Sequence, residues 1–231
     1  MIERLIERLI EKINPTYNAK FKGTGFEVNN WKLSAFILRK IVPVVGVHPF
    51  PLNELLLMTA AVAWTKPTHI FEWGTHIGKS ARIFYETCRF LKIDTVIHSI
   101  DLPDEVEHVE HPHHTRGRLV KGKKNVHLHQ GDGVDTALKI YKTMGEQVRP
   151  LFYLDGDHSY DTVCRELVSI IEQVKNPKII LHDTFYQTEE SGYNIGPFKA
   201  IENVLLKFPH IKFKRIDTNT GLPGMTFLYA A

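Results

Sequence analysis

The sequence predicts an α/β protein built on a doubly wound, mostly parallel seven-stranded sheet. From residue 51 onward, short apolar runs alternate with amphipathic helical segments, which is typical of βαβ units with right-handed crossovers. Near the C-terminus two runs, 211–216 and 225–229, are joined by a turn rich in Gly, Pro and Asn. This short connection predicts an antiparallel hairpin strand at the end of the sheet.

The expected elements follow one another in a regular order. Strands are expected at 68–73, 95–100, 125–129, 151–154 and 178–181, and helices at 52–64, 79–91, 133–143, 160–174 and 197–208. Residues 2–13 repeat a four-residue unit that places aliphatic side chains on one stripe of a helix, and residues 15–50 favour loops around a short helix. We therefore expect an N-terminal helical extension at 1–50 and a main domain at 51–231.

The composition excludes several classes of protein. Hydrophobic residues make up 43% and charged residues 24% of the chain, and 29 Lys and Arg face 26 Asp and Glu without forming a basic stripe. We therefore expect no nucleic-acid partner. The two cysteines are far apart, and no apolar run approaches roughly 18 residues, so we expect a cytoplasmic protein without a membrane partner. The N-terminal helix is expected to pack on the domain, to cover its site or to join two copies.

The first expected strand leads into the glycine-containing turn E-W-G-T-H-I-G-K-S at residues 72–80. Glycines let the backbone bend tightly and approach a ligand, and the N-terminus of the next helix offers unpaired N–H groups. The glycine spacing fits neither the dinucleotide fingerprint nor a phosphate-binding loop. A cofactor-binding turn and a plain tight turn both remain open at this point.

Acidic residues follow the next two strands. Asp101 comes 23 residues after Gly78, close to the spacing at which an acid holds a ribose in nucleotide-binding folds. Asp132 lies between two glycines and is expected either to accept from an adenine amino group or to cap the following helix. With the first turn, these strand ends outline a nucleoside pocket.

The fourth and fifth strands end in acidic and imidazole clusters, at residues 155–160 and 182–184. Side chains at adjacent strand tips converge on one substrate or one metal. Oxygen ligands suit Mg²⁺, whereas imidazole shifts the preference towards softer ions. Helix capping explains Asp157 well, but it explains Asp155 and Asp183 poorly because both directly follow apolar strands.

Five segments now carry a family resemblance: FEWGTHIGKSA, HSIDL, QGDGVDTA, LFYLDGDHSY and IILHDTF. In order and spacing they resemble the motifs of class I S-adenosylmethionine-dependent methyltransferases over about residues 51–231. The nearest branch comprises small O-methyltransferases with a DGDHSY strand end and an HD pair, and metal-dependent catechol, sugar and macrolide O-methyltransferases are more distantly similar. The resemblance implies S-adenosylmethionine as cofactor and methyl transfer to a hydroxyl of a small molecule of sugar or phenol type.

The resemblance also implies roles for individual residues. The cofactor would be held by Glu72, Gly74, Thr75, Gly78, Ser80, Asp101, Asp132 and Asp155, with Asp101 at the ribose and Asp132 beside the adenine. Asp155, His182 and Asp183 match ligands of a divalent metal, Mg²⁺ or similar. His182 departs from the acid that metal-dependent relatives carry, which leaves a softer ion or no metal open. Asp157 and His158 both match positions of a general base.

Other functions remain open at this stage. A non-catalytic module that binds S-adenosylmethionine or another nucleoside is the main alternative, and an NAD-linked oxidoreductase is disfavoured by the absent glycine spacing. The cluster at the fourth and fifth strand ends favours an enzyme, because a binding module does not need it. The His-rich segment 108–114 is expected to be structural or a lid, and the basic residues 121–124 to form a solvated face. Residues 15–50 and 102–124 are expected to shape the acceptor pocket.

Overall fold

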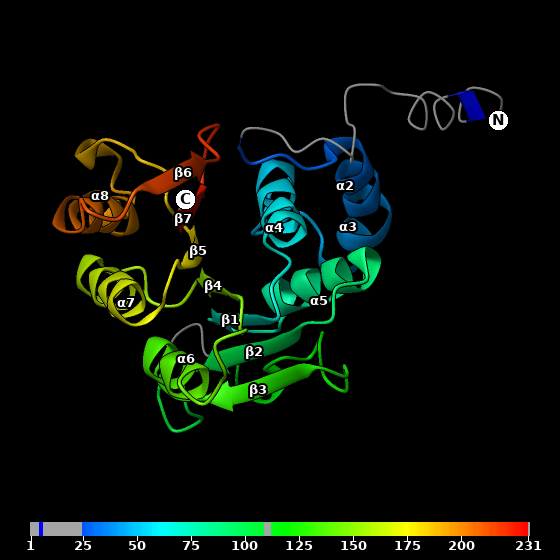
Figure 1. The fold of residues 1–231 in the computed structure, drawn as a ribbon, viewed down its shortest axis with the longest axis horizontal. Helices are drawn as coiled ribbons and strands as arrows, with labels where there is room; N and C mark the ends of the chain where they lie inside the picture. Colours follow the sequence, from blue (N-terminus) through cyan, green and yellow to red (C-terminus); the bar gives the residue numbers. More distant parts are fainter. Residues whose placement is uncertain (1–4, 7–24, 109–111, 231) are drawn as a thin grey trace.

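The computed structural model describes residues 5–6, 25–108 and 112–230. Among these residues, seven strands form one sheet in the order β3-β2-β1-β4-β5-β7-β6 (Figure 1). The parallel strands are β1 (His69–Trp73), β2 (Val96–Asp101), β3 (Val126–Gln130), β4 (Pro150–Leu154) and β5 (Lys178–His182). β7 (Met225–Ala230) runs antiparallel to β5 and to β6 (Phe213–Asp217). The predicted sheet and its C-terminal hairpin are confirmed.

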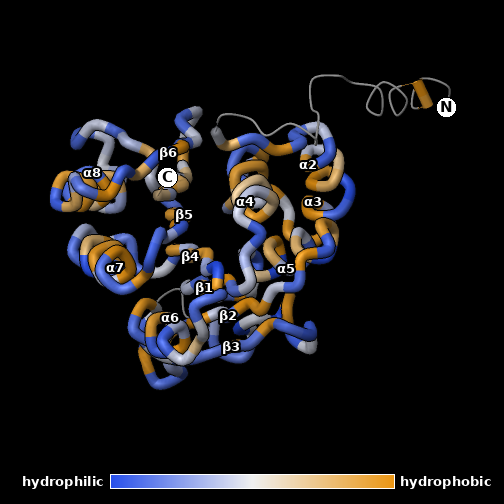
Figure 2. The backbone as a smooth tube through the Cα atoms, viewed as in Figure 1, coloured by the Kyte–Doolittle hydropathy of each residue, from blue (hydrophilic) through white to orange (hydrophobic). Residues whose placement is uncertain are grey.

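Helices cover both faces of this sheet (Figure 1). One face carries α6 (Gly133–Tyr141), α7 (Tyr160–Gln173) and α8 (Gly196–Lys207), and the other carries α4 (Leu52–Thr65) and α5 (Lys79–Leu91). Apolar and polar segments alternate along these helices (Figure 2), as expected for helices with one buried side. All five helices lie where the sequence predicts them.

The central strands separate two apolar cores. Every residue of β4 is buried, and consecutive side chains of a strand point to opposite faces. Phe152 therefore joins the core beneath α7 and α8, whereas Tyr153 joins the core that contains Phe84 of α5. Burial on both faces fixes the parallel strands, whose carboxyl ends lie together along one side of the sheet. Ligands bind outside these ends in such folds.

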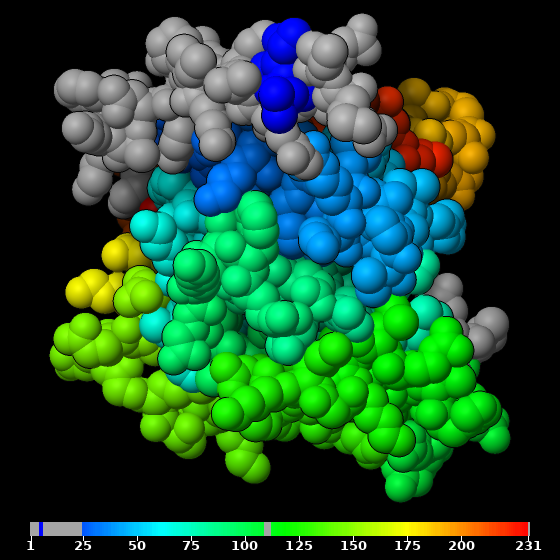
Figure 3. All heavy atoms as spheres, turned by 90° about the vertical axis from the view of Figure 1, so that its right-hand side faces the viewer, coloured from blue at the N-terminus to red at the C-terminus, as the bar shows by residue number. Residues whose placement is uncertain are grey.

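Residues 30–45 differ from the expected loops around one short helix. They are helical throughout, as α2 (Asn30–Phe36), a π-helical segment (Ile37–Ile41) and α3 (Val42–Val45). Pro43 lies in the first turn of α3, where the missing N–H of proline is tolerated, so it does not end the helical stretch. Figure 3 views the side on which this stretch lies next to α5. Its buried apolar stripe comprises Leu33, Phe36, Ile37, Ile41 and Val45.

The predicted helix at 2–13 lies outside the described residues except for Leu5 and Ile6. Both are helical, and their side chains are exposed. The role of this segment, the domain division at residue 50 and the cytoplasmic location stay predictions. Within the described ranges, no helix combines the length and apolarity needed to cross a bilayer.

Glu166 on α7 is a buried acid that supports the end of β1. It is 4% exposed, and its Oε1 accepts a hydrogen bond from the indole N–H of Trp73 at 2.9 Å. Burial raises the pKa of Glu166 from 4.5 to about 8, although the Trp73 hydrogen bond and the charge of Arg165 oppose the shift. The folded protein therefore keeps this carboxyl largely protonated at neutral pH.

We expect Glu166→Gln to stabilise the protein increasingly as pH rises. The unfolded chain loses the Glu166 proton near pH 4.5 and the folded chain near pH 8, so the stability of the parent falls across this interval. Glutamine has no such proton to lose. The difference in unfolding free energy should grow by on the order of 2 to 4 kcal/mol between about pH 5 and about pH 9 in urea denaturation. Glu172→Gln, exposed on the same helix, is the control, and an unchanged pH dependence in Glu166→Gln would contradict the buried-acid interpretation.

Candidate active site

The residues predicted to form the site lie at one edge of the sheet. β1, β2, β3, β4 and β5 are parallel, so their carboxyl ends meet there. The predicted residues fall into two groups at this edge: one around the loop between β1 and α5, and one at the ends of β4 and β5. Doubly wound sheets bind their ligands outside this edge.

Glu72 is a fully buried acid near the end of β1. Its carboxylate accepts hydrogen bonds from the hydroxyls of Ser80 on α5, at 2.5 Å, and of Ser99 on β2. The Ser99 hydroxyl also lies 2.7 Å from that of Thr75. Burial raises the pKa of Glu72 to about 7, while the two serine hydroxyls act in the opposite direction. This network ties the first turn of α5 to β1 and β2.

Gly74 marks a close contact between the two groups of site residues. Its φ of 87° lies in the left-handed region that favours glycine. A Cβ atom at this position would lie 1.8 Å from the backbone oxygen of Asp155. The loop after β1 therefore passes against the end of β4, and only a residue without a side chain fits there. Gly78 has the same φ of 87° and begins α5 without a side-chain cap.

Asp101, the predicted ribose acid, ends β2 and faces the same loop. Its Oδ2 accepts the backbone N–H of His76 at 2.9 Å, and its Oδ1 accepts that of Leu102 at 2.8 Å. The Arg116 Nε lies 3.7 Å from Oδ2. Asp101 thus orders the β1–α5 loop from the neighbouring strand, and a ribose bound here would share the carboxylate with these groups.

The segment after β2 folds back over the β1–α5 loop. Gly117 donates its backbone N–H to the carbonyl of His76 at 2.8 Å, and Leu119 donates to Ile77 at 3.0 Å. Of the His-rich segment 108–114, residues 109–111 lie outside the described part of the chain. The expected lid role of that segment therefore stays a prediction.

Asp132 caps α6, which is one of the two roles that the sequence left open. Its Oδ1 accepts the backbone N–H of Asp135 at 3.0 Å, and its Oδ2 lies 2.6 Å from Nη2 of Arg165. Burial alone would raise the pKa of Asp132, but the Arg165 and Asp135 hydrogen bonds lower it overall. A contact with adenine stays a prediction, and both carboxylate oxygens already have partners.

Asp155, His182 and Asp183 form the second group. The Nδ1 atom of His182 lies 2.9 Å from Oδ1 of Asp155 and 3.2 Å from Oδ2 of Asp183. Each of the three residues offers one potential ligand atom, and these atoms lie within 4.8 Å of one another. The predicted convergence of the β4 and β5 ends is therefore present in the structure.

His158 lies beside this group, whereas Asp157 does not take part in it. The Nε2 atom of His158 approaches Oδ2 of Asp183 to 3.2 Å and Oδ1 of Asp155 to 3.5 Å, without good hydrogen-bond geometry to either. The carboxylate of Asp157 instead accepts the Ser159 N–H and the Thr162 hydroxyl, both at 2.8 Å. Asp157 thus holds the start of α7, and of the two residues only His158 faces the cluster.

Glu54 belongs to the same cluster, although the sequence motifs did not predict it as a site residue. It is fully buried on α4, with Oε2 3.1 Å from Nε2 of His182 and Oε1 accepting the backbone N–H of Gly224 at 2.8 Å. The available signal was a single acid inside the apolar helix LNELLLMTAAVA. Such an acid on a buried helix face needs a polar partner.

Two tyrosines also support the cluster. Tyr153 of β4 donates its hydroxyl to Oδ2 of Asp155 at 3.0 Å. Tyr193 donates its hydroxyl to Oδ1 of Asp183 at the same distance. Tyr193 lies in the irregular segment before α8, where no periodic pattern marks it. Each of the two candidate carboxylate ligands therefore has a hydroxyl that fixes its position.

The carboxylates and imidazoles of the cluster shift one another's pKa values. The carboxylates of Asp155, Asp183 and Glu54 raise the pKa of His182 well above 6.5 against the effect of burial. Burial likewise opposes the shift at Asp155, but His182 and His158 lower its pKa to about 2. The cluster thus combines three carboxylates with two imidazoles, a set of groups that suits the binding of a cation.

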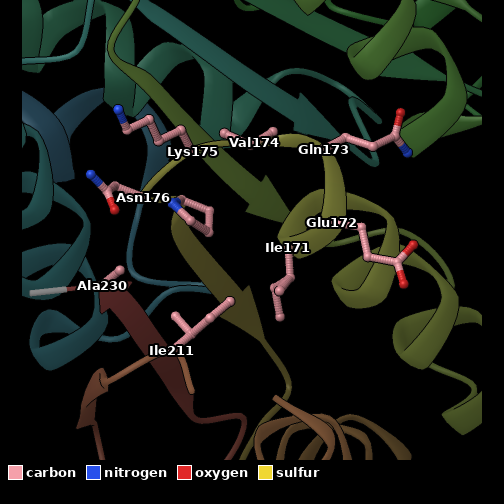
Figure 4. Close-up of a pocket in the computed structure, with 9 residues that line it drawn as sticks. Ile171, Glu172, Gln173, Val174, Lys175, Asn176, Ile211 and Ala230 are labelled. Atoms are coloured by element: carbon pink, nitrogen blue, oxygen red, sulfur yellow. The ribbon is translucent and has the colours of Figure 1, made fainter. Parts of the chain in front are cut away.

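A separate hollow lies far from this cluster. It is lined by the end of α7, by Asn176 and Pro177 before β5, and by Ile211 and Ala230 (Figure 4). β5 begins at Lys178, so the hollow lies at the amino ends of the parallel strands. It is therefore not part of the candidate active site.

Comparison with known proteins points to methyltransferases. Residues 71–184 match a family model described as a methyltransferase domain. This part of the chain is similar to a methyltransferase domain. The match runs from β1 to the residues directly after β5 and so includes both groups of site residues. No curated protein matches the chain significantly.

Solved methyltransferases share the fold. The S-adenosylhomocysteine-bound methyltransferase PaMTH1 of Podospora anserina is 17% identical, with a TM-score of 0.55, over 100% of this chain and 97% of its own. An O-methyltransferase of Bacillus cereus in complex with S-adenosylhomocysteine is 13% identical, with a TM-score of 0.56, over 100% of both chains. The Mg-SAM form of cmcI-D160 is 17% identical, with a TM-score of 0.50, over 78% of this chain and 72% of its own.

Gly74→Ala should destabilise this methyltransferase domain by at least about 2 kcal/mol. The substitution adds the cost of a positive φ to a clash with the backbone of Asp155. Gly122→Ala is the matched control, because Gly122 has a φ of 73° but no atom within 4 Å of a built Cβ. Urea denaturation of both variants separates the two costs. Equal losses of unfolding free energy would show that the contact with Asp155 is unimportant.

Proposed function

We propose that this domain transfers the methyl group of S-adenosylmethionine to a hydroxyl oxygen of a small molecule of sugar or phenol type, assisted by a divalent cation. The observation that carries this proposal is the convergence of Asp155, His182 and Asp183 within 4.8 Å. The contact between Gly74 and Asp155 puts this cluster next to the cofactor loop. Methyl donor and acceptor would therefore meet at the ends of β1 and β4.

The cofactor side of the site is built from the β1–α5 loop. The N-cap of α5 is Gly78, which offers no side-chain cap, and a helix N-terminus attracts the negative charge that a cofactor carboxylate carries. The carboxylate of Glu72 accepts the hydroxyls of Ser80 and Ser99 and so ties both ends of this loop to the sheet. Asp101 and Asp132 are proposed to face the ribose and the adenine, as the family resemblance implies.

The residues at the ends of β4 and β5 fit a divalent cation. Glu54 contacts Nε2 of His182, so a proton held on Nε2 leaves Nδ1 as the nitrogen directed at Asp155 and Asp183. A carboxylate behind an imidazole orients many metal-binding histidines in this way. The Mg-SAM form of cmcI-D160 supports magnesium, while the imidazole also suits softer ions. When bound, the cation would stabilise negative charge on the acceptor oxygen.

The remaining steps fall to residues of the chain itself. His158 is the proposed general base, because its Nε2 faces the cluster and its side chain is 31% exposed, within reach of an acceptor. Tyr153 and Tyr193 hold the two aspartates in place. Methyl transfer needs the acceptor oxygen, methyl carbon and sulfur in line, so this fixed geometry contributes to the rate.

The cofactor assignment is tested by calorimetry with S-adenosylhomocysteine. Asp101→Ala should weaken binding by about 1 to 3 kcal/mol, because the ribose would lose a hydrogen bond to a charged acceptor. Asp94→Ala, an exposed acid at the amino end of β2, should leave the affinity unchanged. Binding of NAD but not of S-adenosylhomocysteine would refute the assignment, and equal affinities of the two variants would remove Asp101 from the site.

The metal-assisted chemistry is tested with a panel of catechols and sugars as acceptors. Asp183→Ala and His158→Gln should each lower turnover by about 100-fold or more while S-adenosylhomocysteine affinity stays within a few-fold, since they act on the acceptor. A chelator should abolish transfer in the parent enzyme. Asp157→Asn is the matched control, because Asp157 only supports the start of α7. Full activity in chelator would refute the role of the cation, and loss in Asp157→Asn alone would reassign the base.

A further inference from the structure

A second group of histidines lies on the sheet, away from the strand ends. Four histidines lie on one face of the sheet: His69 of β1, His98 of β2, and His127 and His129 of β3. His98 is paired with Phe71 on one side and with His127 on the other. His69 and His129 lie two residues from these partners and therefore point to the same face. The ring of His98 stacks on Phe71 at 4.9 Å, which places it on the α6 side of the sheet. Figure 1 shows β2 and β3 next to each other beside α6.

Two of these rings direct nitrogen atoms at one another. Nδ1 of His98 lies 3.1 Å from Nε2 of His129. Two imidazoles bound to one tetrahedral ion at a metal–nitrogen distance of about 2.05 Å would have their nitrogens about 3.4 Å apart. The observed separation therefore needs a change of only a few tenths of an ångström to admit a shared ion.

His98 is poorly satisfied as a hydrogen-bonding group. It is 8% exposed, and its Nε2 is buried without a hydrogen-bond partner among the described residues. A buried unpaired polar atom is costly, and the contact with His129 satisfies only the other ring nitrogen, Nδ1. The nitrogen that faces His129 is Nδ1, so the proposed ion would bind there with the ring proton on Nε2.

Both rings are in the form that binds metals. Burial lowers the pKa of His98 to about 4 and, together with the charge of His127, lowers the pKa of His129, so both rings are neutral at pH 7. Metal ions bind neutral imidazole. A site made of imidazoles selects Zn²⁺, Cu²⁺ or Ni²⁺ over Mg²⁺.

We propose that His98 and His129 bind one transition-metal ion of the Zn²⁺ type across β2 and β3, with water completing its coordination. His129 is only partly buried, which gives the ion and its water a route from solvent. The site is separate from Asp155, His182 and Asp183 and does not depend on the methyl-transfer chemistry. A bound ion would fasten the outer strand β3 to β2, which carries Asp101 at its end.

The test is a zinc titration of the full chain, with Zn²⁺ alone as the probe and calorimetry and thermal unfolding as readouts. The parent should bind one more equivalent of Zn²⁺ than either His98→Phe or His129→Asn. The double variant should lose the same single equivalent, because both residues hold one ion. His69→Asn is the matched control: it removes a ring of the same group whose Nδ1 already contacts the Thr68 hydroxyl at 3.2 Å, and it should keep the parental stoichiometry.

The same variants allow a clear refutation. Zinc bound at the strand-end cluster or by other histidines is common to all of them and cancels in the comparison. His129→Asn changes a partly exposed position on the outer strand, so it tests the site even where His98→Phe fails to fold. Equal zinc stoichiometry and an equal zinc-induced rise in melting temperature in the parent and His129→Asn would overturn the proposal and leave the pair as a hydrogen bond.

Discussion

The candidate active site depends on one buried imidazole held between carboxylates. His182 contacts Glu54 through Nε2, and Asp155 and Asp183 through Nδ1. These contacts join α4, β4 and β5, and Glu54 extends them to the loop before β7 through Gly224. Two isolated carboxylates at neighbouring strand tips would repel each other, so the positive charge between them lets the sheet bring its ends together. A removed partner would leave an uncompensated charge in the interior, which is strongly destabilising.

The cofactor half of the site depends on backbone proximity instead of charge. Gly74 allows the loop after β1 to lie against the backbone of Asp155, and Ser80 and Ser99 hold Glu72 beneath that loop. The two halves therefore share Asp155: its carboxylate belongs to the ionisable cluster and its carbonyl borders the cofactor loop. In the proposed function, this shared residue would couple the position of the methyl donor to that of the acceptor.

Local patterns explain what the sequence could predict. Apolar runs and helical periodicity are properties of neighbouring residues, so the strands and the helices from α4 onward were predictable, and parallel strands then brought Asp155 and Asp183 together. The contact between Glu54 and His182 joins residues 128 positions apart and depends on how α4 packs, which no local pattern records. Asp157 and His158 are adjacent in the sequence, yet Asp157 bonds to Ser159 and Thr162 at the start of α7 and His158 faces the cluster. Pro43 and the nearby glycines masked the apolar stripe of 30–45 because they normally end helices.

A proton and a metal ion would compete for the same atom in this site. Nδ1 of His182 points between Asp155 and Asp183, and the surrounding carboxylates raise the pKa of this ring, so the proton compensates their charge when no cation is bound. A divalent cation would take over that role and release the proton, because metal binding requires the deprotonated nitrogen. Glu54 supports both states, since it contacts Nε2 and leaves Nδ1 directed at the aspartates. A histidine at this position would therefore compensate the carboxylates when no metal is bound, and would make the affinity of the proposed metal site dependent on pH.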